Sequence, residues 1–234
     1  MLDNTTPNRS TQVVIAALNE EEGIGATIAE MSENLRGQRV LVIDGNSTDR
    51  TVEIAKDCGA EIALQDGIGK GDAIAKAIEY LDPQADYVVI TDGDYTYPAE
   101  YVPLMVSILE KNPEVGMVCG NRFNDQAEEN ALQNKFYFGN KLLAFAHSLL
   151  NGVALRDPLT GLRVVRAEIL RNWAVKSKGF DIEVELNHLI GLSGFKTVEV
   201  PIRYRQRLGE KKLKMKHGVT ILKRILLETT RQSP

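Results

Sequence analysis

Residues 87–95 of the 234-residue chain read YVVITDGDY, an apolar run that ends in two aspartates. The run from Tyr87 to Thr91 is typical of a buried β-strand. Asp92 and Asp94 repel each other at this position, and neither carboxylate enters a core cheaply. A divalent cation removes the conflict, because hard oxygen ligands suit Mg²⁺ or Mn²⁺ and the ion can also bind the phosphates of a nucleotide. The stretch alone therefore indicates either a simple turn after a strand or a metal site for a nucleotide diphosphate.

The composition is ordinary for a soluble globular protein, with 43% apolar and 26% charged residues. The length suits one large α/β domain or two small ones. Charge is distributed unevenly, because residues 196–234 hold 11 of the 28 Lys and Arg residues but only 3 of the 32 Asp and Glu residues. This basic C-terminal part predicts an anionic partner, such as phosphate, nucleic acid or an acidic membrane surface, unless it is simply a solvated basic helix.

Cysteine usage and hydropathy indicate the compartment. The two cysteines, Cys58 and Cys119, indicate neither a disulfide framework nor a metal site, so we expect a reducing compartment. The N-terminal residues lack the charged and apolar regions of a signal peptide. No uncharged apolar stretch reaches the length of about 18 residues that a membrane span needs.

The first half of the chain alternates apolar runs with helical patterns, which predicts βαβ units and a mostly parallel sheet. Strands are expected at residues 12–17, 39–43, 60–64, 87–91 and 115–120. Helices are expected near residues 21–35, 48–58, 70–81 and 98–111. The site of such a sheet lies at the carboxyl ends of its strands.

Polar motifs follow these predicted strand ends. Asn19 and Glu20 follow the first strand, and Asp44 follows the second, where it could accept hydrogen bonds from a base or ribose. Residues 46–49 offer side chains that could cap the next helix. The glycine-rich residues 67–71 permit a tight turn from which Lys70 could reach phosphate, although the spacing is not that of a Walker A loop. A short glycine-rich connection without a ligand is the alternative.

Two amphipathic stretches occupy the second half. Residues 132–151 place Phe138, Leu142, Phe145, Ala146 and Leu149 on one side, with Asn134, Lys141, Ser148 and Asn151 opposite. A second stripe consists of Ile221, Leu222, Ile225 and Leu226, with Lys223 and Arg224 beside it and residues 211–216 before it. Each stretch is either core packing or a helix on an anionic membrane surface. His147 and His217 are expected to be bystanders.

Seven motifs in register resemble the family 2 glycosyltransferases, and within them the dolichyl-phosphate mannose synthase group. The likeness extends over about residues 11–226. The motifs are ALNE at 17–20, IDGNSTDRT at 43–51, GKG at 69–71, DGDYTYPAE at 92–100, GNR at 120–122, DPLTGLR at 157–163 and RLGEKKL at 207–213.

The resemblance implies an α/β fold of the Rossmann-like GT-A type, with a mostly parallel sheet and amphipathic interfacial helices in the C-terminal half. It implies a single domain over residues 1–234, with a nucleotide-binding half at about 11–120 and an acceptor- and membrane-facing half at about 121–234. The implied reaction is inverting transfer of a hexose from a nucleotide diphosphate sugar, with UDP or GDP, to dolichyl or another polyprenyl phosphate.

The same resemblance implies roles for residues of the donor site. Asn19, Glu20 and Asp44 would hold the nucleoside. Asp92 and Asp94 would hold Mg²⁺ or Mn²⁺ on the diphosphate, with Asp94 the more direct ligand.

Roles near the acceptor are implied for four further residues. Arg122 would contact the acceptor phosphate, and Asp157 would orient the acceptor or assist as a base, unless it is a turn residue before Pro158. Arg207 and Lys212 would close over the pyrophosphate or the acceptor phosphate, or else belong to a solvated basic loop.

Three motifs depart from the pattern of the group. Ala17-Leu18 replaces a proline and an aromatic residue, and Tyr95-Thr96-Tyr97 replaces Leu-Gln-His after the second aspartate, where a third metal contact is usual. Lys211 stands where serine is common.

Many members of the group continue into transmembrane helices, whereas the given sequence stops at Pro234. We therefore expect a peripheral protein at the cytoplasmic membrane face, docked by its own helices or by a membrane-anchoring partner protein, unless the sequence is truncated. Alternatives are transfer to a soluble sugar or protein, or a non-catalytic scaffold that binds a nucleotide sugar. Nucleic-acid binding is not expected, because the basic tail lacks interleaved aromatic residues and the body is acidic.

Overall fold

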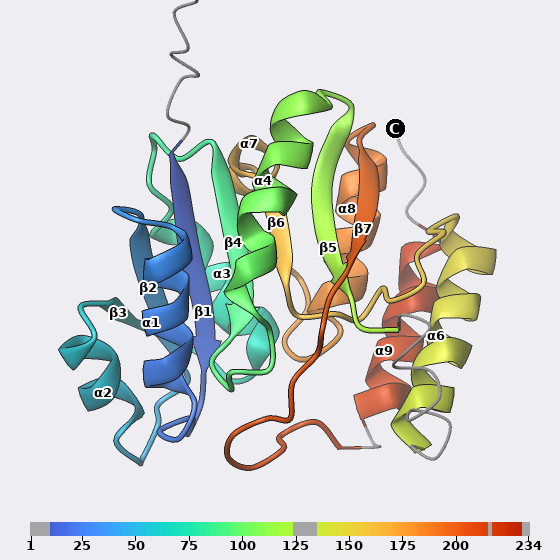
Figure 1. Ribbon diagram of the computed structural model, residues 1–234. Coiled ribbons are helices and arrows are strands. Elements are labelled where there is room, and N and C mark those ends of the chain that lie inside the picture. The colour runs from blue at the N-terminus through green and yellow to red at the C-terminus, as the bar shows by residue number, and fades with distance from the viewer. Residues whose placement is uncertain (1–9, 124–134, 215–216, 231–234) are drawn as a thin grey trace, which may run out of the picture.

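The computed structural model describes residues 10–123, 135–214 and 217–230, and the strands in these residues form one seven-stranded sheet (Figure 1). The strands are β1 Thr11–Ala17, β2 Arg39–Asp44, β3 Glu61–Leu64, β4 Tyr87–Asp92, β5 Val115–Asn121, β6 Arg163–Arg166 and β7 Lys196–Pro201. Their order is β3-β2-β1-β4-β6-β5-β7. Only β6 runs antiparallel to its neighbours, so the predicted mostly parallel α/β class is confirmed.

The helices lie on both sides of this sheet and, for α6 and α9, beyond its β7 edge. They are α1 Ile24–Asn34, α2 Thr51–Asp57, α3 Lys70–Glu79, the short 3-10 helix η1 Ala99–Tyr101, α4 Val102–Lys111, α6 Lys135–Asn151, α7 Ala167–Arg171, α8 Ile182–Leu192 and α9 His217–Glu228. The five predicted strands and the four predicted helices of the first half are all present. Four elements, β6, β7, α7 and α8, were not predicted from the sequence.

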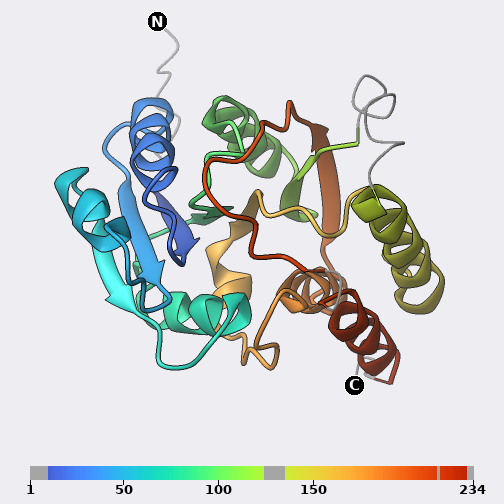
Figure 2. The same cartoon turned by 90° about the horizontal axis from the view of Figure 1, so that it is seen from below.

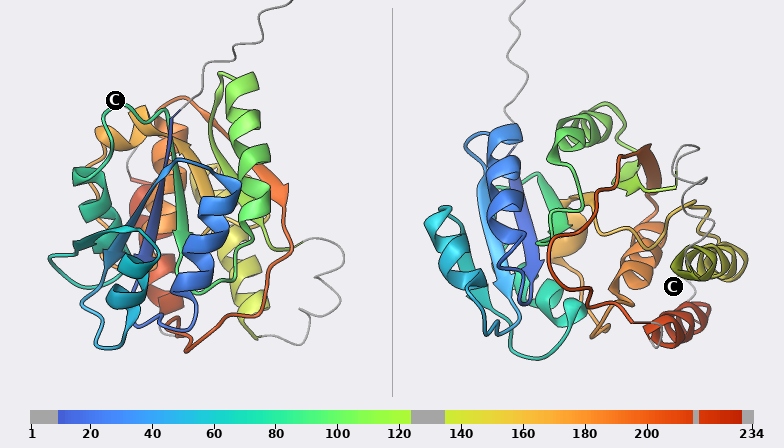
Figure 3. Two further views of the ribbon diagram at one scale, coloured as in Figure 1. Left: turned by 60° about the vertical axis from the view of Figure 1, so that its left-hand side comes forward. Right: turned by 60° about the horizontal axis from the view of Figure 1, so that its bottom comes forward.

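Each strand contributes to two cores because its side chains alternate between the faces of the sheet. Val13 and Ile15 of β1 pack into the core beneath α1, α2 and α4, whereas Val14 packs into the core beneath α3, α7 and α8. Burial on both faces explains why the central strands are nearly continuous apolar runs. The two helical layers enclose the sheet in both views of Figure 3.

Helices α6 and α9 lie side by side beyond the β7 edge of the sheet, on the right in Figure 1. Ile221 and Ile225 of α9 are buried against Val184 of α8, together with the partly buried Leu143 and Ala146 of α6. The predicted stripe on residues 132–151 is therefore corrected at Ala146, which packs inward. Leu132 and Asn134 of that prediction lie outside the described residues.

The rest of the first stripe is exposed. Phe138, Leu142, Phe145 and Leu149 are 58–71% exposed and form one face of α6. The second stripe divides, because Ile221 and Ile225 are buried whereas Leu222 and Leu226 are exposed, as is Val219. We call the exposed residues Phe138, Leu142, Phe145, Leu149, Val219, Leu222 and Leu226 the apolar face.

Arg224 also differs from one of the two arrangements expected for its stretch, in which Arg224 and Lys223 lie together on an anionic membrane surface. The side chain is buried, its Nε donates to Asp181 Oδ2 at 2.9 Å, and its Nη1 lies 3.3 Å from Glu228 Oε1. A carboxylate cluster, rather than lipid, neutralises this charge.

Candidate active site

The predicted polar groups converge at the carboxyl ends of the parallel strands, the lower edge in Figure 1. Asp44, at the end of β2, is paired in register with Ala17 of β1, and Asp92, at the end of β4, is paired with Ala16. The two acids are 48 positions apart in sequence but lie on either side of the same strand. Figure 2 looks onto this edge and shows the segment after β7 crossing it.

One subsite is formed by the turns after β1 and β2. The Asn19 side-chain oxygen accepts the Thr48 N–H at 2.8 Å, and the Asn19 N–H donates to Ser47 Oγ at 2.8 Å. Oδ2 of Asp44 accepts the Ser47 N–H at 2.9 Å, while Oδ1 is buried with no hydrogen-bond partner among the described residues. An acceptor left unpaired in this way is costly unless a ligand supplies a donor.

Asp92, the last residue of β4, and Asp94 each contact a cationic side chain from elsewhere in the chain. Oδ1 of Asp92 lies 2.6 Å from Nζ of Lys70, and Oδ2 of Asp94 lies 3.3 Å from Nη1 of Arg207. Oδ1 of Asp94 also accepts hydrogen bonds from the N–H and hydroxyl of Thr96, at 3.1 and 2.6 Å. Burial raises the pKa of Asp94, and the neighbouring charge of Asp92 raises it further.

Asp92 and Asp94 fit a divalent cation by the chemistry of their donors. They supply two hard carboxylates at one strand end, and their mutual repulsion is what a cation would relieve. The described residues contain no group of three or more His, Cys, Asp or Glu that could hold a metal ion. A cation here would therefore take its other ligands from a bound phosphate and water.

Tyr97 stands where a third metal contact is usual in the group. The side chain is buried, and its hydroxyl accepts the Gly161 N–H at 2.7 Å. Burial raises the pKa of this phenol. The ring also packs edge-on against Tyr204, with centroids 5.2 Å apart. Tyr97 therefore fixes the backbone at Gly161 and does not supply a metal ligand in this structure.

Residues 202–214, which we call the strap, cover the strand ends. The Arg205 and Leu208 N–H groups donate to the backbone oxygens of Thr96 and Asp94, at 3.0 and 3.1 Å. Nη2 of Arg207 lies 2.6 Å from the Glu20 carboxylate. The strap is thus attached directly to the loop that carries the two aspartates.

Lys212 of the strap fastens it to the turn after β1. Its Nζ donates to the Asn19 backbone oxygen at 2.6 Å and lies 3.0 Å from Glu20 Oε1. Burial raises the pKa of Glu20, although the hydrogen bonds from Arg207 and Lys212 oppose that rise. Three predicted residues, Glu20, Arg207 and Lys212, therefore form one ion-paired cluster.

Arg122, directly after β5, is half-buried and forms an ion pair with the buried Asp157. Nε and Nη2 of Arg122 each lie 2.7 Å from an Asp157 oxygen, and the Arg122 N–H donates to Oδ2 at 3.0 Å. Burial alone would lower the pKa of Arg122, but the Asp157 charge outweighs it and the pKa is raised. Asp157 is fully buried, and this bidentate geometry favours a role in orienting Arg122.

Aromatic side chains connect Arg122 to the helices beyond the sheet. Its guanidinium carbon lies 5.4 Å from the Tyr204 ring centroid and 5.5 Å from that of Phe123. Nζ of Lys141 on α6 lies 5.4 Å from the same Phe123 centroid. Phe123 thus links the site to α6.

Several contributors were not identified from the sequence. Glu199 of β7 accepts the N–H groups of Arg156 and Asp157, each at 2.8 Å, and so holds the Asp157 loop. Glu183 of α8 lies 2.7 Å from Nζ of Lys70. The available signal is that Glu183 and Glu199 each lie between two apolar residues in sequence, because a carboxylate that is buried with its neighbours needs a buried partner.

Comparison with known proteins shows the family of the chain. The chain belongs to glycosyl transferase family 2, whose profile matches residues 12–173. A dolichyl-phosphate hexose transferase of Haloferax volcanii is 36% identical over 203 residues, which cover 86% of this chain and 85% of that protein. The dolichol-phosphate mannosyltransferase of Pyrococcus furiosus is 26% identical, with 87% of this chain but only 59% of that protein covered.

Solved structures share the fold. Glucosyl-3-phosphoglycerate synthase of Mycobacterium tuberculosis, solved with Mn²⁺, UDP and phosphoglyceric acid, superposes with a TM-score of 0.75 at 20% identity, covering 97% of this chain and 80% of that one. The GT-A type of fold expected from the sequence is confirmed. Among the helices that the structure describes, none has the length and apolar character needed to cross a membrane.

Proposed function

We propose that this protein transfers a hexose from a uridine diphosphate sugar to dolichyl or another polyprenyl phosphate, with inversion at the anomeric carbon. The observation that carries the proposal is the position of Arg122. Its guanidinium is paired with Asp157 inside the site and stacked on Phe123, whose ring also contacts α6, the helix that presents most of the apolar face. A phosphate joined to a long apolar chain suits this arrangement.

Asp44 supports uridine over guanosine in the donor. One of its oxygens is already bonded to the Ser47 N–H, so one unpaired oxygen remains. Uracil presents a single ring N–H, whereas guanine presents an N–H and an amino group side by side and would use both oxygens of a carboxylate. Asn19 and Glu20 complete the proposed nucleoside site.

Asp92 and Asp94 are the residues that would hold Mg²⁺ or Mn²⁺. The bound ion would neutralise charge on the departing diphosphate. Arg207 and Lys212 would do the same from the strap by exchanging their carboxylate partners for phosphate oxygens. The mycobacterial synthase was solved with Mn²⁺ or Mg²⁺ and UDP, which supports this assignment through the shared fold.

The acceptor needs little activation. A phosphate monoester has a second pKa of about 6, so it is already anionic at neutral pH. An acceptor oxygen would attack the anomeric carbon as the bond to the diphosphate breaks, and the electron pair would leave with UDP. Arg122 would position the attacking phosphate, oriented by Asp157, and no strong base is required.

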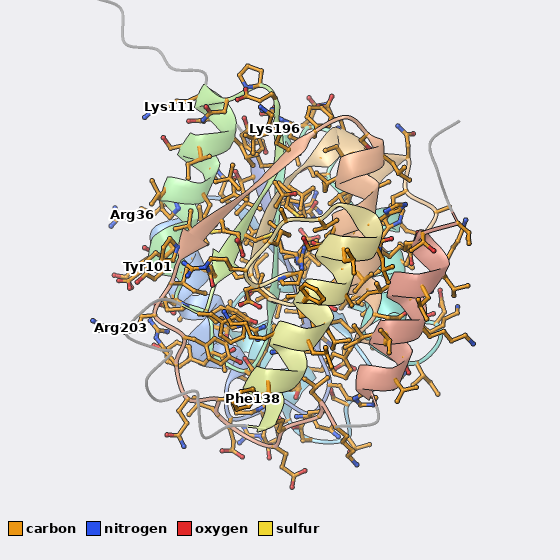
Figure 4. The ribbon with its side chains drawn as sticks, turned by 90° about the vertical axis from the view of Figure 1, so that its right-hand side faces the viewer. Arg36, Tyr101, Lys111, Phe138, Lys196 and Arg203 are labelled. Atoms are coloured by element: carbon orange, nitrogen blue, oxygen red, sulfur yellow. The ribbon has the colours of Figure 1, made fainter. Side chains whose placement is uncertain are left out.

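The apolar face supports a peripheral position on the cytoplasmic membrane surface. Figure 4 looks onto α6 and α9 and shows Phe138 at the end of α6 nearest the edge where the strands end. A membrane would cover this face and deliver the lipid phosphate beside Arg122. A membrane-anchoring partner protein would bury the same residues. The division into a donor half at about 11–120 and an acceptor half at about 121–234 is part of the proposal.

The test is transfer of labelled hexose into an organic-extractable product. The purified chain receives Mn²⁺ or Mg²⁺, a polyprenyl phosphate in detergent, and UDP- or GDP-hexoses in parallel, with Asp94→Asn as the inactive control. Metal-dependent label in the lipid phase from a UDP-sugar is the expected result. Label from GDP-sugars alone would overturn the uridine assignment.

A second candidate keeps the donor but takes a soluble phosphorylated acceptor, because the mycobacterial structure with the same fold was solved with phosphoglyceric acid. The same assay with phosphoglycerate, free sugars and a protein acceptor tests it. Label in the aqueous product only would favour this candidate, and donor binding without any transfer would favour a scaffold.

A further inference from the structure

We infer that Glu183 is a positioning residue of the donor site. Its carboxylate holds the Lys70 ammonium in place against Asp92. The inference rests on the proposed function and deepens it. The expected role of Lys70 also changes. Instead of contacting a phosphate, its ammonium orients the Asp92 carboxylate.

The geometry is a three-membered chain of charges. Nζ of Lys70 lies 2.6 Å from Oδ1 of Asp92 and 2.7 Å from Oε1 of Glu183. The Lys70 and Glu183 side chains are each 8% exposed, and that of Asp92 is 29% exposed. The ammonium is therefore enclosed between the two acids, and only Asp92 has an edge open to the site.

The backbone fixes the start of α3, where Lys70 lies. The N–H groups of Gly71 and Asp72 both donate to the Lys178 backbone oxygen, at 3.0 and 3.3 Å. A Cβ on Gly71 would overlap the backbone oxygen of Ser177, so this close approach needs glycine. The glycines that resembled a phosphate-binding turn thus serve to pack α3 against the segment that leads into α8.

The same segment positions Glu183 in the first turn of α8. Asp181, directly before α8, pairs with Arg224 of α9 at 2.9 Å. Glu185, in the same first turn, accepts the N–H groups of Lys176 and Ser177, at 2.9 and 2.6 Å. These contacts leave Glu183 facing Lys70 from a fixed backbone.

The Lys70 ammonium contacts two carboxylates, although one would be enough to neutralise it. Lys70 and Asp92 already neutralise each other, so Glu183 adds a buried negative charge and gives the three groups a formal net charge of −1. Burying that extra charge is unfavourable for folding. We therefore look for a role of Glu183 at the donor site. When a cation binds at Asp92, the Lys70 ammonium is repelled by it, and Glu183 supplies the attraction that retains the ammonium. Asp92 then keeps its orientation, with its other oxygen against Gly161.

The test measures metal binding rather than turnover. Mn²⁺ affinity in the presence of UDP is followed by electron paramagnetic resonance for the wild type, Glu183→Gln, Lys70→Met and the double variant. We expect Glu183→Gln to bind Mn²⁺ about tenfold more weakly, the scale seen when outer-shell partners of metal ligands are removed. The double variant should be no weaker than Lys70→Met, because Glu183 acts through Lys70.

Glu228→Gln is the matched control. Glu228 is another buried acid, paired with Arg224, and its loss should lower the melting temperature without changing Mn²⁺ affinity. Wild-type affinity in Glu183→Gln, or losses that multiply in the double variant, would overturn the positioning role. Failure of the wild type to bind Mn²⁺ with UDP would instead overturn the proposed function.

Discussion

Glu20 and Arg207 are 187 positions apart in the chain, yet Nη2 of Arg207 lies 2.7 and 2.6 Å from the two oxygens of the Glu20 carboxylate. Nη1 of the same guanidinium lies 3.3 Å from Asp94. One strap residue thus bridges the turn after β1 and the predicted metal ligand. Since a diphosphate is a stronger anion than either carboxylate, the donor would compete for this guanidinium.

Arg207→Ala should therefore lower kcat/KM for the nucleotide sugar by about 10²-fold, the scale of losing one preorganised contact to a developing charge. Arg203→Ala is the matched control in the same strap. Its side chain is exposed, and the backbone N–H of Arg203 approaches the Tyr101 hydroxyl at 3.3 Å (Figure 4). Steady-state kinetics on both variants checks the prediction, and equal losses would contradict it.

Asp94→Asn should separate activity from stability. The amide retains an oxygen for the two hydrogen bonds from Thr96 but loses the charge that a cation requires. Because burial raises the pKa of Asp94, its ionised form is disfavoured in the folded protein, and the amide removes that cost. We expect metal-dependent turnover to fall by about 10³-fold while the melting temperature is equal or higher. A lower melting temperature would show that the carboxylate stabilises the fold.

Arg122 and Asp157 give a prediction about stability. Asp157 is fully buried, so Arg122→Ala leaves an unpaired buried charge and should reduce the free energy of unfolding by about 3–5 kcal/mol. Asp157→Leu combined with Arg122→Met should cost less than the sum of the single changes, because neither charge then remains. Urea unfolding of Arg122→Ala, Asp157→Leu, Arg122→Met and the double variant measures this, and additive costs of the last two single changes would refute the coupling.

The strand-end acids could be predicted from the sequence because the carboxyl ends of parallel strands meet at one edge. Asp44 and Asp92 follow long apolar runs, so their convergence required only that the sheet be parallel. Their partners could not be predicted in the same way. Glu183 contacts Lys70 only through the packing of α8 against α3, and no local pattern records that contact.

The second half of the fold was less predictable for a related reason. Strand β6 has four residues and includes Arg163, which is 1% exposed. Its guanidinium donates to the backbone oxygens of Pro158 and Thr160 and to Asn187 Oδ1, so its charge is accommodated by tertiary hydrogen bonds. From the sequence alone, an arginine is expected to be exposed at the protein surface. The burial of Arg224 was not predicted for the same reason.

The apolar face should bind lipid vesicles. Replacing both Phe145 and Leu149 by glutamine removes two large apolar side chains, each worth about 1.5–3 kcal/mol when fully buried. We expect the affinity for vesicles containing anionic lipid to fall at least tenfold, as measured by co-sedimentation. Leu104→Gln, an exposed apolar residue on α4, is the control. Unchanged vesicle binding in the double variant would instead favour a protein partner at this face.

His147 makes stability depend on pH. Its ring is fully buried in α6, Nδ1 lies 3.0 Å from Nδ2 of Asn151, and Nε2 has no hydrogen-bond partner among the described residues. Burial lowers the pKa of His147 from 6.5 to about 4, with smaller effects from the charges of His188 and Arg163. Between these two values the unfolded chain holds a proton that the folded chain does not. The contribution of the buried, neutral His147 to the free energy of unfolding is therefore fully present above pH 6.5. It is lost as the pH falls toward 4.

The expected loss from this histidine is about 2 kcal/mol in the free energy of unfolding between pH 7 and pH 5. Urea unfolding at both values measures it in the wild type and in His147→Gln, whose side-chain oxygen can still accept from Asn151. The change in the free energy of unfolding between pH 7 and pH 5 should be about 2 kcal/mol smaller in His147→Gln than in the wild type. His217→Gln, at a partly exposed histidine that begins α9, should retain the wild-type difference. An equal pH dependence in wild type and His147→Gln would mean that His147 takes up its proton in the folded protein as readily as in the unfolded chain.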